Sequence, residues 1–99
     1  MNAQEVIVVV QLKLDVNHRE EFLQTLFEVV ERSRIARGCL CYELFSRADD
    51  ENTLFVFQMW STREAFEQNW LYTDLPRINT NSHLLAGPPV SWELSQLQL

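Results

Sequence analysis

Basic residues are scarce in this 99-residue chain: eight Lys and Arg stand against 14 Asp and Glu, which gives a formal net charge of -6. Nucleic acids and anionic membrane surfaces are bound through clusters of Lys and Arg, and the sequence has no such cluster. No apolar run approaches membrane-spanning length, and the first residues lack the basic start of a signal peptide. We therefore expect a cytoplasmic protein that binds neither nucleic acid nor membrane.

Cysteine and histidine are also scarce, with two of each. Cys39 and Cys41 would share one face of a strand at a spacing of roughly 6.6 Å, which is too wide for easy disulfide bonding. A metal site would need further ligands, and the sequence offers only His18 and His83 as histidines. We therefore expect two structural thiols and no metal site.

Apolar residues are plentiful, at 46% of the chain against 22% charged residues, as in ordinary globular proteins. Ninety-nine residues suit a single domain, residues 1–99, with a modest core. Periodicity and turn residues predict the following elements. They are strand 6–14, helix 18–37, strand 39–45, a polar hairpin loop 47–52, strand 54–60, helix 62–72, short helix 75–85 and strand 90–97.

Helix starts are marked by two capping signatures. Ser61 with Glu64, and Asn17 with Glu20, have the spacing of a capping box, in which the first side chain accepts a hydrogen bond from the first turn and the acid reaches back. Asp74 is expected to cap the short helix that follows, with a proline tolerated in its first turn.

The predicted order β-α-β-β-α-β is that of the ferredoxin-like α+β fold, an antiparallel sheet with both helices on one face. Strands 6–14 and 54–60 are nevertheless apolar on both faces, and helices can cover only one. A second copy packing sheet to sheet would cover the rest, so we expect a homodimer. The residues expected to need this second cover are Val8, Val10, Leu12, Phe55, Phe57 and Met59.

The joint between strand 54–60 and helix 62–72 is the most promising place for a pocket. Trp60 ends the strand, and Gln58 lies two residues earlier on the same strand face. Asn69 falls on the inner side of the helix, where a buried amide needs partners. Glu43 and His83 are the candidate bases.

Arg37-Gly38, the run 39–44, and Gln58-Met59-Trp60 followed by 61–66 resemble the antibiotic biosynthesis monooxygenase family over nearly the whole chain. The resemblance implies a dimeric α+β barrel of ferredoxin-like units. Members include cofactor-independent oxygenases of anthrones, quinol monooxygenases, haem-degrading enzymes and an isomerase of a small signalling sugar derivative. The family therefore implies the fold more closely than the reaction.

Carried over position by position, the resemblance keeps part of the family's site. Trp60 matches the tryptophan implicated in catalysis in the anthrone oxygenases. Their asparagine on the same strand falls at Val56, and their tyrosine falls at Phe66. The family's common acid on this strand falls at Gln58, and its common helix histidine falls at Asn69.

The haem-degrading branch uses an asparagine, a tryptophan and a histidine. These align with Gln11, Asn69 and Asn79, which leaves no axial ligand for haem iron. His83 lies one helical turn after Asn79 and would replace the histidine only in another register. We therefore expect no cofactor.

An oxygenase of this kind binds an electron-rich aromatic ring, removes a proton and stabilises the anion, which then reduces dioxygen. The expected catalytic residues are Trp60, Gln58, Asn69 and His83. The residues expected to bind the substrate are Gln11, Phe66, Trp70, Tyr72 and Asn79.

Two other classes stay open. One is an isomerase of a small carbonyl compound on the same scaffold, and the other is a non-catalytic dimeric ligand-binding protein. A pocket that gathers Gln58, Asn69 and His83 would favour an enzyme. An interface filled solid by Trp60, Phe66 and Trp70 would favour the binding protein.

Overall fold

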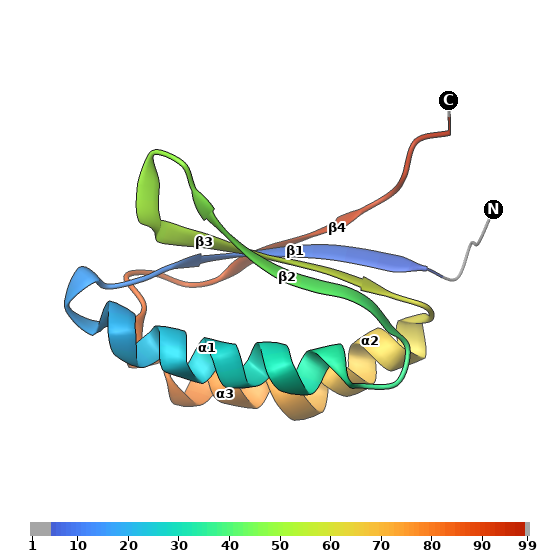
Figure 1. Ribbon diagram of the computed structural model, residues 1–99, viewed down its shortest axis with the longest axis horizontal. Helices are drawn as coiled ribbons and strands as arrows, with labels where there is room; N and C mark the ends of the chain where they lie inside the picture. The colour runs from blue at the N-terminus through green and yellow to red at the C-terminus, as the bar shows by residue number, and fades with distance from the viewer. Residues whose placement is uncertain (1–4, 99) are drawn as a thin grey trace.

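The computed structural model describes residues 5–98 as a four-stranded sheet covered on one face by helices (Figure 1). In chain order the elements are β1 (Val6–Lys13), the 3-10 turn η1 (Val16–His18), α1 (Arg19–Arg34), β2 (Cys39–Arg47), β3 (Asp50–Trp60), α2 (Arg63–Asn69), the π-helical segment η2 (Trp70–Asp74), α3 (Leu75–Thr80), the 3-10 turn η3 (Ser82–Leu84) and β4 (Val90–Leu94).

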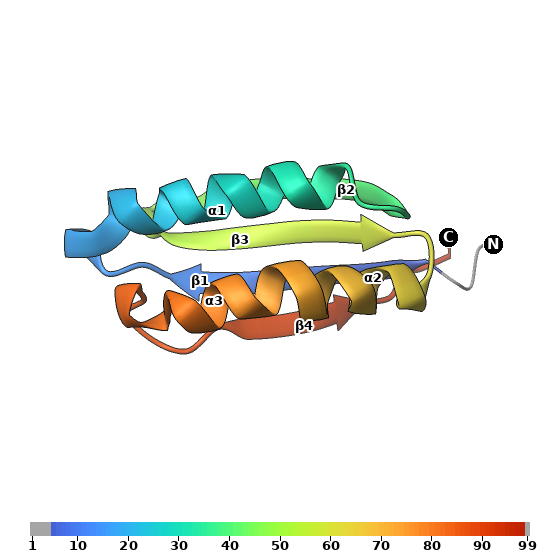
Figure 2. The ribbon, with the colours of Figure 1, turned by 90° about the horizontal axis from the view of Figure 1, so that it is seen from below.

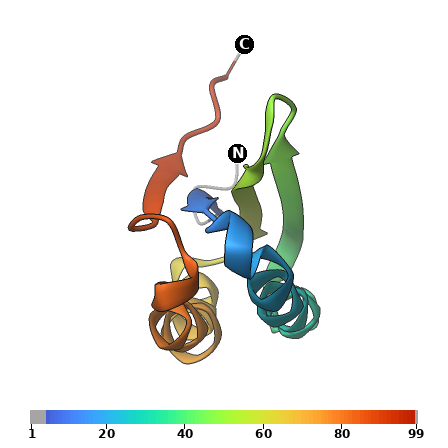
Figure 3. The same ribbon diagram turned by 90° about the vertical axis from the view of Figure 1, so that its left-hand side faces the viewer.

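The strand order is β2-β3-β1-β4, and every neighbouring pair is antiparallel. Helix α1 and the helical stretch from α2 to α3 lie side by side beneath the sheet (Figures 2 and 3). This is the ferredoxin-like arrangement predicted from the sequence. No helix within residues 5–98 is long and apolar enough to cross a membrane.

The two faces of the sheet differ in what covers them. Val8, Val10 and Leu12 are buried against the helices, so the expectation that they need a second cover was wrong. Their neighbours on β1 point to the opposite face, because successive side chains of a strand alternate. We call this opposite surface the open sheet face. Strand alternation and register place on it Ile7, Val9, Gln11, Cys41, Glu43, Phe45, Phe55, Phe57, Met59, Val90, Trp92 and Leu94.

A bulge in β2 separates the two cysteines. Cys39 pairs with Trp60, whereas Cys41 pairs with the preceding residue of β3, Met59. Adjacent residues of β3 face opposite sides of the sheet, so the two thiols also face opposite sides. The prediction that they share a face was therefore wrong, because the extra residue Leu40 resets the alternation. Both cysteines are free.

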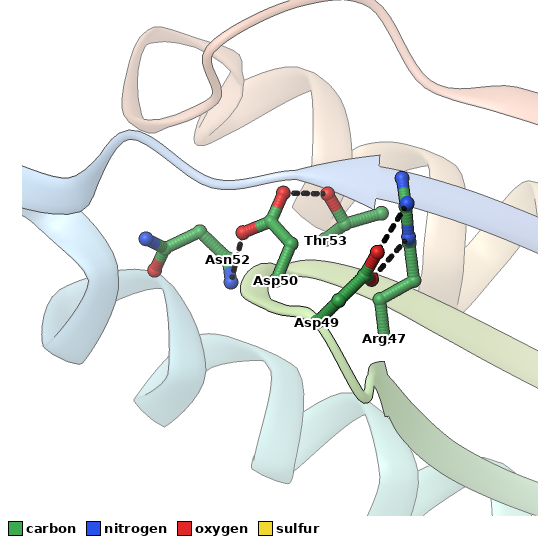
Figure 4. Close-up of polar contacts among 5 residues, drawn as sticks. All are labelled: Arg47, Asp49, Asp50, Asn52 and Thr53. Atoms are coloured by element: carbon green, nitrogen blue, oxygen red, sulfur yellow. Dashed lines mark hydrogen bonds and ion pairs between the residues drawn. The ribbon is translucent and has the colours of Figure 1, made fainter.

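The β2–β3 hairpin is held by its own polar side chains (Figure 4). Arg47 donates two hydrogen bonds to the carboxylate of Asp49, both at 2.8 Å. The carboxylate of Asp50 accepts from the backbone N–H of Asn52 at 3.0 Å and from the hydroxyl of Thr53 at 2.7 Å. The acids that the sequence places in this loop thus shape its turn.

The connection into α2 depends on one glycine. Gly38 has φ +85°, and a Cβ added there would lie 2.6 Å from the Cβ of Ala65. Its carbonyl accepts the backbone N–H of Ser61 at 2.8 Å. A glycine is required because the backbone is left-handed and α2 packs directly against it.

Both predicted caps are displaced by a residue or two. Thr62, not Ser61, caps α2 by accepting the N–H of Ala65 at 3.1 Å. Asp15, not Asn17, makes the side-chain cap of η1 before α1. In each case the last residue in extended conformation before the helix is not the one expected. The side-chain oxygen of that residue accepts a free N–H of the first turn and so becomes the cap.

The helix on the second side does not stop at Asn69. It widens into η2, where the N–H of Leu75 bonds the carbonyl of Trp70, and continues as α3. Pro76 explains the widening, because its ring would clash with the carbonyl four residues earlier and it has no N–H to donate. Asp74 therefore lies inside a continuous helix rather than capping a new one, and its side chain is buried.

Candidate active site

Six side chains form a buried polar cluster between the sheet and the helices, and we call it the Asp74 cluster. Its members come from both helical arms and from the two strands β2 and β3. All are at most 6% exposed. They are Ser33 of α1, Tyr42 of β2, Gln58 and Trp60 of β3, Asn69 of α2 and Asp74 of η2.

Asp74 is the centre of this cluster. The hydroxyl of Tyr42 donates to its Oδ2 at 3.1 Å. Asn69 Nδ2 donates to its Oδ1 at 3.2 Å, and Ser33 Oγ donates to the same oxygen at 3.4 Å. Asn69 Nδ2 also donates to Ser33 Oγ at 3.0 Å. The carboxylate is thus fixed from three sides by neutral donors.

Gln58 and Trp60 form the other half of the cluster. Trp60 Nε1 donates to Gln58 Oε1 at 2.8 Å, which fixes the amide. Gln58 Nε2 is buried and has no hydrogen-bond partner among the described residues. The Gln58 amide still lies near enough to Asp74 to favour the charged carboxylate. An unpaired buried N–H group is costly, so the position of this donor beside Asp74 calls for a reason.

Burial raises the pKa of Asp74 from 3.8 to about 6. The hydrogen bonds from Tyr42, Ser33 and Asn69 lower the pKa of Asp74, as does the nearby Gln58 amide, but together they do not offset the loss of solvation. Burial, followed by the nearby charge of Asp74, also raises the pKa of Tyr42, so its hydroxyl stays protonated. At neutral pH the cluster therefore presents one carboxylate whose pKa suits a general base.

Asp74 and Tyr42 reach the wall of a small cavity between α1, the sheet and the η2–α3 stretch. The cavity has a free volume of about 10 Å³, which is room for about one water molecule. Apart from these two residues, Thr25 and Arg77, its walls are apolar: Val10, Leu12, Phe22, Leu26, Val29, Val56, Trp70 and Ile78.

A larger groove opens to solvent on the other side of Asn69. It encloses about 690 Å³ between the end of α1, the Gly38 turn and the outer side of α2 and η2. Asn69 lines this groove and also bonds Asp74, so its amide separates the open groove from the buried carboxylate.

Three of the four residues predicted as catalytic, Trp60, Gln58 and Asn69, come together in the cluster. The fourth, His83, is exposed on η3 and does not line the cavity. Glu43, the other candidate base, is exposed and binds Arg34 at 2.7 Å.

The predicted substrate-binding residues are divided. Trp70 lines the cavity and stacks on Phe66, with ring centroids 6.4 Å apart. Tyr72 is 75% exposed, and Asn79 is also exposed. Gln11 lies on the open sheet face, with the whole thickness of the sheet between it and Asp74.

Sequence reasoning missed Asp74, Tyr42 and Ser33. The sequence predicts Asp74 as a helix cap because Leu75-Pro76 follows it, and Tyr42 has nothing in its sequence position to distinguish it from any aromatic residue of a strand. Of the three, only Ser33 could have been found from the sequence, because it falls on the buried stripe of α1 with Val29 and Val30. A polar residue in an apolar stripe indicates a buried partner.

Within residues 5–98, no three His, Cys, Asp or Glu side chains gather closely enough to hold a metal ion. The cluster and the cavity beside it offer a buried carboxylate, an amide N–H and an apolar wall.

Comparison with known proteins identifies the family of this chain. The chain is 29% identical over 62 residues to YcnE of Bacillus subtilis (strain 168), a candidate monooxygenase, and 25% identical over 65 residues to the uncharacterized protein sll1783 of Synechocystis. These matches span 63% and 66% of this chain, but only 65% and 44% of those relatives' own lengths.

Two solved structures share the fold. Rv0793 from Mycobacterium tuberculosis has a TM-score of 0.85 at 22% identity, covering 96% of this chain and 97% of that one. SnoaB, a cofactor-independent oxygenase from Streptomyces nogalater, has a TM-score of 0.80 at 17% identity, covering 98% and 97%. The model of the family "Antibiotic biosynthesis monooxygenase" matches residues 5–74, from the start of β1 to Asp74. The chain therefore belongs to the antibiotic biosynthesis monooxygenase family.

Proposed function

We propose that the protein is a cofactor-independent monooxygenase that oxidises a quinol, an anthrone or a similar electron-rich aromatic with dioxygen. The observation that carries the proposal is the buried carboxylate of Asp74, with a pKa of about 6, beside an apolar cavity and an unpaired amide N–H of Gln58. Membership in the family and the likeness of the fold to SnoaB support it.

The first step is removal of a proton from the substrate by Asp74. A base with a pKa near the working pH is deprotonated often enough to act and still accepts a proton well. The negative charge that develops on the substrate oxygen is stabilised by Gln58 Nε2, which Trp60 holds in place from the other end of the amide. Tyr42, Ser33 and Asn69 keep the carboxylate oriented.

The substrate anion then supplies the electrons. It transfers one electron to dioxygen, and the resulting substrate radical and superoxide combine to form a carbon–peroxide bond. Cleavage of the O–O bond with loss of water leaves a carbonyl, so that a CH₂ group and O₂ become C=O and H₂O. Two hydrogens and four electrons leave the substrate carbon, and both oxygen atoms are accounted for.

The cavity must open before a ring can enter, because it has room for about one water as it stands. Its wall on the second helical side is made by Trp70, Arg77 and Ile78 of the η2–α3 stretch. A π-helical turn of this kind is commonly found at functional sites, where helical geometry is already interrupted. We place the opening movement in this stretch.

Oxygen uptake by the purified, chelator-treated protein with a panel of hydroquinones and anthrones tests the proposal. We expect consumption of one O₂ for each anthrone converted to its quinone, with no added cofactor. A Trp60→Phe variant removes the N–H that fixes Gln58 and should lower the rate while keeping an aromatic ring in the core. Uptake with the same rate in this variant would contradict the role given to Gln58.

An isomerase of a small carbonyl compound is the second candidate. A carboxylate base beside an amide N–H also suits removal of a proton next to a carbonyl, with the N–H stabilising the enolate oxygen. Oxygen uptake distinguishes the two reactions, because an isomerase converts its substrate without consuming oxygen. A binding protein without catalysis would do neither.

We also propose that the protein is a homodimer formed through the open sheet face. Its residues Phe45, Val90, Trp92 and Leu94 are between 42% and 56% exposed in the single chain. Soluble proteins rarely leave so large a contiguous apolar area in water. A second copy related by a two-fold axis would cover both faces at once.

Light scattering should therefore give a particle of twice the chain mass of 11.7 kDa at micromolar concentration. Phe57→Glu places a charge in the middle of the open sheet face and should shift the particle toward one chain. Phe27→Glu is the matched control, because Phe27 is already 55% exposed on α1. A wild-type particle of one chain would refute the dimer.

A further inference from the structure

Arg77 is the only basic side chain among the residues that line the cavity. It belongs to α3, three residues after Asp74. Residues three apart on a helix are neighbours, with Cβ atoms about 5–6 Å apart, so Arg77 and Asp74 flank the same space. The cavity wall thus carries a negative and a positive group at adjacent positions in otherwise apolar surroundings.

The guanidinium of Arg77 is already bound to a carboxylate of this chain. Its NH1 lies 2.7 Å from Oε2 of Glu28 on α1, a residue that does not itself line the cavity. The two partners differ in exposure: the Arg77 side chain is 32% exposed, and that of Glu28 is 61% exposed. Glu28 can therefore turn into water at little cost, because exposed ion pairs contribute little to stability.

We propose that the substrate carries a carboxylate, and that this carboxylate replaces Glu28 on Arg77. The proposal rests on the proposed function, since it names the class of aromatic that the same site takes. A planar guanidinium binds a carboxylate in a bidentate manner, which fixes orientation as well as position. Repulsion from Asp74 excludes the reversed orientation, and the reacting part of the ring then faces the base.

The exchange also accounts for how a closed cavity admits a ring. The bond between Arg77 and Glu28 joins α3 to α1, the two helices that contribute to the cavity wall. Its release frees the wall formed by Arg77 and Ile78 from the opposite helix, while the incoming carboxylate keeps Arg77 paired. Entry of the ring and capture of its carboxylate are then parts of one movement.

Binding measurements without oxygen test whether Arg77 binds a carboxylate of the ligand, because no oxidation can then occur. The probes are 2,5-dihydroxybenzoate and its neutral counterpart 2,5-dihydroxybenzamide, titrated by calorimetry into the wild type and three variants. Arg77→Gln removes the charge and keeps a polar stem, and Glu28→Gln frees Arg77. Arg63→Gln is the matched control, because Arg63 forms a similar exposed pair with Glu93 outside the cavity.

We expect the wild type to bind the benzoate about tenfold more tightly than the benzamide, as a charge-assisted hydrogen bond predicts. Arg77→Gln should bring that ratio to about one, Glu28→Gln should raise it several-fold, and Arg63→Gln should leave it unchanged. A wild-type ratio near one, or one that Arg77→Gln does not change, overturns the proposal, as does the absence of binding by both probes.

Oxygen uptake with the same probes under air keeps the two proposals apart. Uptake without a preference for the benzoate refutes the role of Arg77 and leaves the monooxygenase standing. A preference that depends on Arg77, without uptake by any tested aromatic, assigns an anion-binding residue and refutes the oxidation.

Discussion

Asp74→Asn should lower the rate of oxygen uptake at least about 100-fold, because a positioned general base contributes roughly 10²–10⁴ to the rate of proton abstraction. The amide has nearly the same shape, so it keeps a side chain beside Tyr42 and Asn69 but cannot accept the proton. For the wild type, the rate should rise with pH through about 6, the pKa of the carboxyl group, as its charged form becomes populated. The variant should lack this rise.

Asp49→Asn is the matched control for this substitution. Asp49 is an exposed carboxylate of the β2–β3 hairpin, bound to Arg47 and absent from the cavity wall. Its loss should leave the rate unchanged. Circular dichroism of both variants would confirm that they fold. A folded Asp74→Asn protein with the wild-type rate would show that the base lies elsewhere, with exposed His83 the next residue to substitute.

The contribution of Asp74 to the stability of the wild type should fall as pH rises from about 4 to about 6. The carboxyl group of Asp74 has a pKa of about 6 in the folded protein against 3.8 as its ordinary value, so the folded state holds its proton more tightly. The stabilisation is complete below pH 4 and is lost as the pH passes through 6. The pKa of about 6 in the folded protein exceeds the ordinary value of 3.8 by about two pKa units, which corresponds to about 3 kcal/mol of unfolding free energy over the full titration.

Urea unfolding of the wild type and of Asp74→Asn at pH 4, 5, 6 and 7 measures this term. From pH 4 to pH 7, the unfolding free energy of the wild type should fall by about 2–3 kcal/mol relative to that of the Asp74→Asn variant. Comparing the pair removes the contributions of the hairpin acids Asp49 and Asp50, whose pKa values are lowered. A difference that is independent of pH would mean that Asp74 is solvated in the folded protein.

Local pattern was enough to find one side of the candidate site. Trp60 and Gln58 alternate on one strand, and Asn69 falls on the inner side of the next helix, so spacing alone predicts that they converge. The fold class followed from the order of strands and helices in the same way. These inferences held because periodicity over a few residues decides which side chains face the core.

The other side of the site could not be found in this way. Asp74 bonds Ser33 and Tyr42, which lie 41 and 32 residues earlier in the chain. No local pattern records such contacts, since they exist only when both helical arms have packed on the sheet. Pro76 marked a helix boundary by ordinary rules, but the helix widened around it and carried Asp74 inward.

The rule that successive side chains of a strand face opposite sides of the sheet gave a wrong prediction where the backbone is irregular. The bulge at Leu40 turned Cys39 and Cys41 to opposite faces.

The prediction for Val8 and Val10 was wrong for another reason. They were expected on the face that needs a second cover, but the structure places Ile7 and Val9 there. A strand that is apolar on both faces does not show which of its residues the helices cover.

The sequence by itself determined the ferredoxin-like order, through the succession of its elements, and the family, through the resemblance of its motifs. It also determined that Trp60, Gln58 and Asn69 face the core, because this depends on spacing along one strand and one helix. Only the tertiary structure decided that Asp74 is the buried carboxylate of the site, with Arg77 beside it in the cavity wall. The physical reason is desolvation. A carboxyl group gains a raised pKa from the segments that pack around it, and those segments come from distant parts of the chain.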